Sequence, residues 1–146
     1  FLIQPYYKNL TSSLVKTPKL FWFDNGLLRH LSGFGFDIDN GELYENYVAS
    51  EMMKLIRTRR LDTRLYFYRT RSGMEIDFML ETKYGIVALE VKNRDTVSSS
   101  DFSKLKRIAE SGITSWCGGI VVYRGNKIQK FGNGLWAVPS FRLFGP

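Results

Sequence analysis

The stretch MEIDFMLETKYGIVALEVK (residues 74–92) decides the fold of this chain. Two apolar-rich runs lie on either side of turn residues at 83–85, a pattern that predicts two antiparallel strands joined by a tight turn. The run LYFYRTR (residues 65–71) comes before them, with a second turn at Ser72 and Gly73. The three runs together predict a β-meander.

Helical patterns lie on both sides of this meander. Before it, the segment 39–42 (Asp-Asn-Gly-Glu) is typical of a capping box, and apolar periodicity predicts a helix over residues 42–57. After it, a helix is predicted over residues 101–111, followed by three more strand-like runs from residue 118 onward. The order helix, meander, helix, strands predicts an α/β fold, a three-layer sandwich with a central mixed β-sheet flanked by helices.

The first 40 residues show a different organisation. Short strands are predicted over residues 1–4 and 19–23, and a helix capped by Asp24 over residues 25–31. We therefore expect residues 1–40 to be an N-terminal extension and residues 41–146 to form the main domain.

Composition excludes several classes of protein. The chain has 146 residues, 44% of them apolar or aromatic, and a net charge of +7, which suits one globular domain with a polyanionic partner. No run is long enough to span a membrane, and the start lacks the layout of a signal peptide. One histidine, His30, argues against zinc sites and His-based triads, and the one cysteine, Cys117, is expected to be a small buried residue. We expect a cytoplasmic fragment of a longer protein.

A glutamate lies on the apolar side of the predicted helix 42–57. On a helical wheel, Glu45 falls between Met52 and Ile56, while Asn46 and Ser50 lie on the opposite, polar side. A carboxylate directed at the core is costly unless another group compensates its charge.

Further charges alternate along the predicted strands. Alternation places Glu75, Asp77, Met79 and Glu81 on one face of the second strand, and Glu90 and Lys92 together on one face of the third. A polar sheet face in water is the simplest explanation. The helix carrying Glu45 needs a surface to cover, however, and this favours a shared site under that helix.

Glu45, Asp77 and Glu90 could converge there with Lys92. Three carboxylates with open positions suit Mg²⁺ or Mn²⁺. A neighbouring lysine can orient a water molecule or stabilise charge that develops on a phosphate. The group therefore favours hydrolysis of a phosphodiester.

A basic segment follows the helix. Six arginines lie between residues 57 and 71, interleaved with aromatic residues, which suits a nucleic acid, although an ordinary solvated strand would show the same composition. The candidate nucleic-acid contacts are Arg57, Arg59, Arg60, Arg69 and Arg71. Lys104, Lys106 and Arg107 are interpreted as a solvated helix face.

The sequence motifs around these charged residues resemble those of a known superfamily. The pattern runs PKLFWFDNGLL (18–28), GELYENYVASEM (41–52), YFYRTRSGMEIDFML (66–80) and ALEVK (88–92). It is similar to PD-(D/E)xK nucleases of the Holliday-junction-resolvase-like kind, and specifically to a prokaryotic family of C-terminal domains that follow a P-loop AAA-type ATPase.

The resemblance implies a restriction-endonuclease-like core and a Mg²⁺- or Mn²⁺-dependent nuclease. Glu45, Asp77 and Glu90 would be the metal ligands, Lys92 the catalytic lysine, and Glu75 an accessory acid that assists the metal or pairs with an arginine. The resemblance implies two partners, a nucleic acid and the upstream ATPase domain. DNA is the favoured nucleic acid, but the sequence does not distinguish DNA from RNA. No proline precedes Asp77, and Met74 stands where the family usually has a small residue. The alternative is a non-cleaving module that binds nucleic acid or protein.

Overall fold

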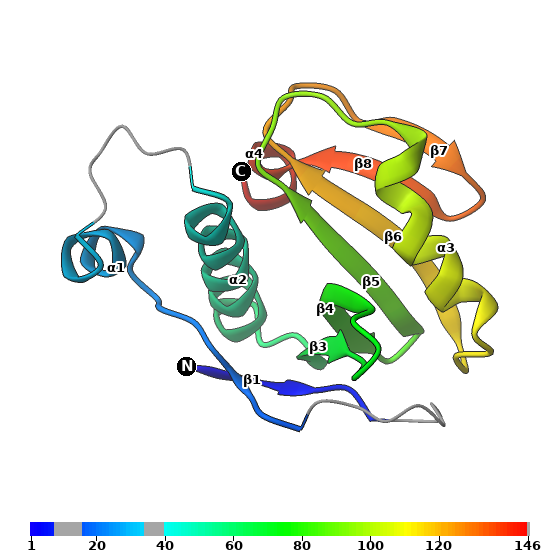
Figure 1. The fold of residues 1–146 in the computed structure, drawn as a ribbon, viewed down its shortest axis with the longest axis horizontal. Helices are drawn as coiled ribbons and strands as arrows, with labels where there is room; N and C mark the ends of the chain where they lie inside the picture. Colours follow the sequence, from blue (N-terminus) through cyan, green and yellow to red (C-terminus); the bar gives the residue numbers. More distant parts are fainter. Residues whose placement is uncertain (8–15, 34–39, 146) are drawn as a thin grey trace.

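The computed structural model describes residues 1–7, 16–33 and 40–145 (Figure 1). Its strands are β1 (Leu2–Pro5), β2 (Lys19–Leu20), β3 (Thr63–Arg69), β4 (Glu75–Thr82), β5 (Gly85–Lys92), β6 (Trp116–Tyr123), β7 (Gln129–Gly132) and β8 (Leu135–Pro139). Its α-helices are α1 (Asn25–Leu31), α2 (Gly41–Thr58), α3 (Ser103–Glu110) and α4 (Ser140–Phe144), and a 3-10 turn at Ser99–Phe102 leads into α3.

All eight described strands belong to one mixed sheet in the order β2-β1-β3-β4-β5-β6-β8-β7. The predicted meander is confirmed, because β3, β4 and β5 are consecutive antiparallel neighbours. Beyond β5 the sheet turns parallel, with β6 beside β5 and β8 beside β6. The α/β class and the mixed sheet predicted from the sequence are therefore present.

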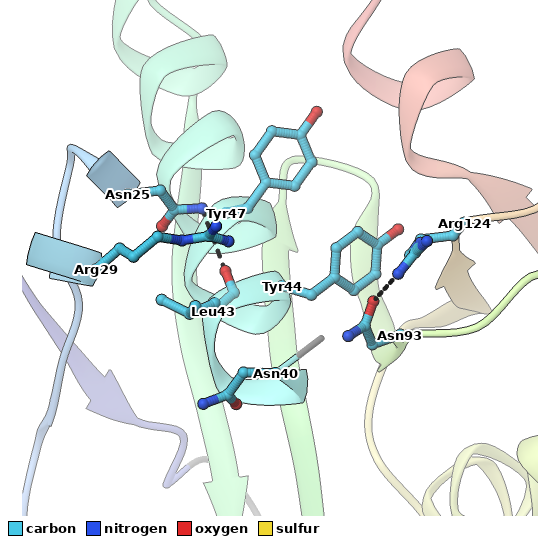
Figure 2. Close-up of a pocket in the computed structure, with 8 residues that line it drawn as sticks. All are labelled: Asn25, Arg29, Asn40, Leu43, Tyr44, Tyr47, Asn93 and Arg124. Atoms are coloured by element: carbon cyan, nitrogen blue, oxygen red, sulfur yellow. Dashed lines mark hydrogen bonds between the residues drawn. The ribbon is translucent and has the colours of Figure 1, made fainter. Parts of the chain in front are cut away.

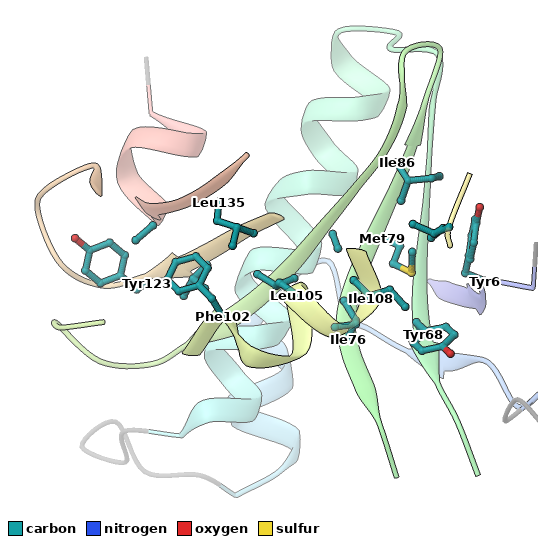
Figure 3. Close-up of a cluster of buried hydrophobic side chains, with 14 residues drawn as sticks. Tyr6, Tyr68, Ile76, Met79, Ile86, Phe102, Leu105, Ile108, Tyr123 and Leu135 are labelled. Carbon is teal, nitrogen blue, oxygen red and sulfur yellow. The ribbon is translucent and has the colours of Figure 1, made fainter. Parts of the chain in front are cut away.

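Helices cover both faces of this sheet. In Figure 1, α2 lies on one side of β5 and α3 on the other. Each helix packs on its own apolar cluster. The α2 cluster includes Val48, Met52, Phe67, Phe78 and Leu89. The α3 cluster, drawn in Figure 3, includes Ile76, Met79, Phe102, Leu105 and Ile108.

A β-bulge in β4 interrupts the alternation expected along that strand. Tyr66 pairs with Met79 but Tyr68 pairs with Ile76, so β4 carries one residue more than β3 between these pairs. Ile76 and Met79 consequently belong to the same apolar cluster, on the α3 side, while Phe78 belongs to the other. The predicted alternation from residue 74 to 81 was wrong for this reason.

Helix α2 begins at Gly41, one residue before the predicted start. Asn40 is the N-cap, and its side chain accepts a hydrogen bond from the Glu42 N–H at 2.8 Å. Asp39, part of the predicted capping box, lies outside the described residues. Asp24 caps α1 as predicted, accepting from the Leu27 N–H at 2.9 Å.

The side of α2 predicted to be polar is buried in part. Asn46 and Ser50 are 4% and 2% exposed. The Asn46 side chain accepts from the Trp22 N–H at 2.7 Å and donates to the Trp22 carbonyl at 3.0 Å, as a neighbouring strand would. The segment before α1 therefore docks on this side of α2, which a helical wheel drawn for the helix alone does not reveal.

The described part of residues 1–40 packs on the main domain. β1 pairs in parallel with β3, and Phe21 is buried in the α2 cluster. Cys117 is exposed rather than buried, because the pairing of β5 with β6 shifts register between Ile86 and Val87, opposite this residue. Among the described residues, no helix is both long and apolar enough to cross a membrane.

Replacing Asn46 with alanine tests how the N-terminal segment is held. Asn46→Ala removes both hydrogen bonds to Trp22, so we expect a loss of about 1–3 kcal/mol in the free energy of unfolding. Amide exchange around Trp22 should accelerate in hydrogen–deuterium exchange. Ser50→Ala is the matched control, because the Ser50 hydroxyl bonds to the Tyr47 carbonyl of its own helix. Unchanged exchange at Trp22 in Asn46→Ala would contradict this account of docking.

Candidate functional site

Charged side chains from five elements gather where β4 begins and β5 ends. Glu75 and Asp77 come from β4, and Glu90 and Lys92 come from β5. Three further residues reach them from β2, α2 and α3. We call the set the carboxylate–lysine cluster: Lys19, Glu45, Glu75, Asp77, Glu90, Lys92 and Lys104.

Asp77 lies at the bulge, in the middle of this cluster. The pairing of β4 with β5 ends at Phe78 and Leu89, so the backbone of β4 does not continue the ladder past Asp77. The Asp77 carboxylate replaces a backbone partner there, because it accepts a hydrogen bond from the Val91 N–H at 2.7 Å. Bulges commonly redirect a side chain in this way beside functional sites.

On the α2 side, Lys19 joins two carboxylates. Its ammonium lies 3.3 Å from the Glu45 carboxylate and 2.5 Å from that of Glu75. Glu45 thus faces inward from α2, as the helical wheel predicted. Arg69 contacts the other oxygen of Glu75 at 3.6 Å. Glu75 therefore makes the arginine pair that was one of its two predicted roles.

On the α3 side, Glu90 lies between two lysines. Its side chain is 1% exposed, and Lys92 and Lys104 each approach it at 3.2 Å. Glu90 lies two residues beyond Ala88, which packs in the α3 cluster. The cluster therefore spans both sides of the sheet, and the expectation that alternation would bring all these groups to one face was wrong.

Burial raises the pKa of three carboxylates in the cluster, and repulsion from Asp77 adds to the rise for the two glutamates. Burial is the largest cause of the raised pKa of Glu45, Asp77 and Glu90, and for Glu90 the value is about 7. Asp77 is the second cause for both glutamates. Burial lowers the pKa of Lys19, but Glu45 and Glu75 outweigh it, so this ammonium stays charged. The three lysines therefore offset only part of the cost of the buried acids.

The donor chemistry of the cluster suits a hard divalent cation. Glu45, Asp77 and Glu90 supply carboxylate oxygens, the ligands that Mg²⁺ and Mn²⁺ prefer. Within the described ranges, however, no three acidic, histidine or cysteine side chains are already grouped to hold an ion. Lys19 and Lys104 are instead paired with Glu45 and Glu90.

The predicted nucleic-acid contacts fall into two groups. Arg69 and Arg71 lie at the β3–β4 turn, beside Glu75. Arg57, Arg59 and Arg60 lie at the end of α2, where Arg57 packs over the Phe23 ring at 5.2 Å. β3 separates the two groups by roughly 20 Å, at about 3.3 Å per residue. The structure therefore does not form one compact arginine patch.

Lys19 and Lys104 are the members of the cluster that sequence reasoning missed. Lys104 was assigned to a solvated helix face, and Lys19 had no assigned role. Lys104 borders the apolar stripe of α3, but so does Lys106, so the helical pattern does not distinguish them. Both contacts join residues distant in sequence, and short-range patterns carry no signal for them.

The raised pKa of Glu90 predicts a pH-dependent stability. The folded state holds the Glu90 proton up to about pH 7, whereas the ordinary pKa is 4.5, so stability falls as pH rises between these values. Glu90→Gln removes this fall. We expect the variant to gain on the order of 1–3 kcal/mol relative to wild type between about pH 5 and about pH 8 in chemical denaturation.

The control for this comparison is Glu51→Gln, on α2 but outside the cluster, where Glu51 pairs with Lys54. Its difference from wild type should stay constant over the same range. Parallel stability curves for Glu90→Gln and wild type would show that Glu90 is ionised in the fold.

Comparison with known proteins places the domain in a family. No curated protein matches the chain. A family model described as "Domain of unknown function (DUF4143)" matches residues 40–143, a range that includes every member of the cluster except Lys19. Domains of this kind are typically found after AAA ATPase domains. Since the match covers most of the chain, the protein belongs to the DUF4143 family.

Proposed function

We propose that this domain hydrolyses phosphodiester bonds in nucleic acid with a divalent cation held by Glu45, Asp77 and Glu90. The observation that carries the proposal is the position of Asp77, a half-buried carboxylate that interacts with acids and lysines from both sides of the sheet. Such a concentration of buried acids is costly to a fold, and it recurs where a cation is used in catalysis. The meander flanked by α2 and α3 supports a restriction-endonuclease-like core.

Each residue of the cluster has a role in this proposal. When bound, Mg²⁺ or Mn²⁺ supplies an acidified water molecule and offsets negative charge on the phosphate. Lys92, 29% exposed, can donate a hydrogen bond to a phosphate oxygen or to the attacking water. The Val91 N–H fixes the Asp77 carboxylate, and Glu75 orients Lys19 and Arg69. We propose DNA as the first substrate to test. We also propose that the protein is cytoplasmic and that an ATPase domain precedes this domain in the chain.

The lysine pairs favour a second candidate function. If Lys19 and Lys104 remain bound to the acids, the cluster is a neutralised structural element rather than a cation site. The domain would then be a non-cleaving module that binds nucleic acid or protein. Metal binding separates the two candidates.

Asp77→Asn provides the test. Without metal, we expect the variant to be as stable as wild type or more so, because it relieves repulsion with Glu45 and Glu90. Wild type should gain thermal stability with millimolar Mg²⁺ or Mn²⁺ and should cut single-stranded, duplex or junction DNA. The variant should lose both properties, since it lacks a ligand. Asp62→Asn, an exposed acid before β3, is the control and should keep them.

Three results are informative. Metal-dependent stabilisation with cutting, both abolished by Asp77→Asn, supports the hydrolase. Stabilisation without cutting supports an assembled cation site whose activity requires the ATPase domain. Identical melts with and without metal, together with no cleavage, leave the binding module as the better account.

The two arginine groups predict distinct salt dependences of DNA binding. The logarithm of the affinity should fall with the logarithm of salt concentration by roughly one unit of slope per phosphate contact. We expect Arg69→Gln/Arg71→Gln to reduce the slope by about two, measured by anisotropy over a salt series. An equal reduction in Arg59→Gln/Arg60→Gln indicates one phosphate track along β3. A slope that neither double variant changes argues against arginine contacts.

A further inference from the structure

A cavity of about 330 Å³ lies at the N-terminal end of α2 (Figure 2). It is bounded by α1, the first turns of α2 and the loops that follow β5 and β6. Two residues that line the cavity are sequence neighbours of residues in the cluster. Tyr44 precedes Glu45 on α2, and Asn93 follows Lys92 at the end of β5. The cavity therefore lies one residue along the backbone from Glu45 and from Lys92, although no side chain of the cluster lines it.

The charged side chains that line this cavity are basic. Figure 2 shows Arg29 entering from α1 and Arg124 from the opposite wall, after β6. Arg124 donates a hydrogen bond to the Asn93 side chain at 3.2 Å, which holds its guanidinium at the rim. No acidic residue lines the cavity within the described chain. The Arg124 guanidinium also lies 3.8 Å from the Asp95 carboxylate, which does not line the cavity. Guanidinium groups suit a phosphate group, because their planar N–H donors match its oxygens.

Two tyrosines supply an aromatic wall. The rings of Tyr44 and Tyr47 are stacked, 6.0 Å apart and 24° from parallel. Aromatic rings beside basic side chains are the usual means of holding single-stranded bases, because every base has a face that can stack.

The Tyr44 hydroxyl is a polar atom in need of a partner. It is buried and meets the distance and angle criteria for a hydrogen bond with none of the described residues, although a looser side-chain contact with Ser140 and the charge of Arg124 lower its pKa. Such an atom costs about 1–3 kcal/mol unless a ligand supplies an acceptor.

We infer that this cavity binds one unpaired nucleotide of a strand whose backbone continues into the carboxylate–lysine cluster. Arg29 and Arg124 hold a phosphate, a base stacks on the tyrosine wall, and the Tyr44 hydroxyl donates to the nucleotide. A base reaches such a cavity only when it is unpaired, so single strands or unpaired ends are the preferred ligands. The inference rests on the proposed function and specifies its substrate.

The binding test uses a short fluorescein-labelled oligothymidylate in EDTA, where metal-dependent cutting does not occur. In anisotropy titrations at low salt, Arg29→Gln should weaken binding about tenfold, as expected for one charge-assisted hydrogen bond. Tyr47→Leu should weaken it by a similar factor of about ten through lost stacking. The matched controls, Arg107→Gln on α3 and Tyr84→Leu in the exposed β4–β5 turn, should change the Kd less than about twofold.

Tyr44→Phe distinguishes a ligand contact from a structural one. Removing a buried hydroxyl without a partner should raise the melting temperature of the free protein and weaken oligonucleotide binding. A purely structural tyrosine would not show this opposition. Unchanged affinity in both Arg29→Gln and Tyr44→Phe overturns the inference, as does tighter binding of a fully paired duplex than of the single strand.

The two proposals fail separately. Cleavage that depends on Asp77 but is indifferent to Arg29 and Tyr44 removes the nucleotide cavity and leaves the hydrolase. Single-strand binding that depends on Arg29 and Tyr44, with no cleavage at any metal concentration, supports the cavity and removes the hydrolase.

Discussion

The hydrogen bond from the Val91 N–H to the Asp77 carboxylate is the contact on which the candidate site depends. The bulge adds a residue to β4, and the ladder to β5 ends at Phe78 and Leu89. Beyond that point the Val91 N–H lacks a strand partner, and a buried N–H without one is costly. The Asp77 side chain fills this role at 2.7 Å. A carboxylate is thereby fixed where the two strands separate, within reach of charges from both helical layers.

At that position several acids lie close to one another, and lysines neutralise their charge only in part. The charge of Asp77 raises the pKa of both Glu45 and Glu90, and burial raises the pKa of all three acids. Lys19 and Lys104 approach the two glutamates from opposite sides of the sheet. A divalent cation would bring two positive charges to the same acids. Lysine pairing and metal binding are therefore competing ways of neutralising the same acids.

Short-range patterns were sufficient to predict the meander, the Asp24 cap of α1 and the inward direction of Glu45, because each depends on neighbours within a turn or a strand. Long-range features were not predictable in this way. The bulge at Asp77 reverses which face of the sheet the following residues of β4 occupy. The sequence of β4 contains no glycine or proline that would mark the position of the bulge. Asn46 was assigned to a polar face because the wheel contains no information about the segment that docks on it. Lys104 reaches Glu90 only through the packing of α3 on the sheet.

The contribution of Lys19 links the cluster to the N-terminal segment. Lys19 precedes the residues matched by the family, and its strand β2 contacts the sheet through β1. Two features hold the segment after it against the main domain, the burial of Phe21 and the bonds between Asn46 and Trp22. Because Asn46 is adjacent to Glu45 on α2, the same helical turn holds both the segment and the acid that Lys19 neutralises. Docking of the segment and neutralisation of the site are therefore coupled, and release of the segment would remove one competing cation from the acids.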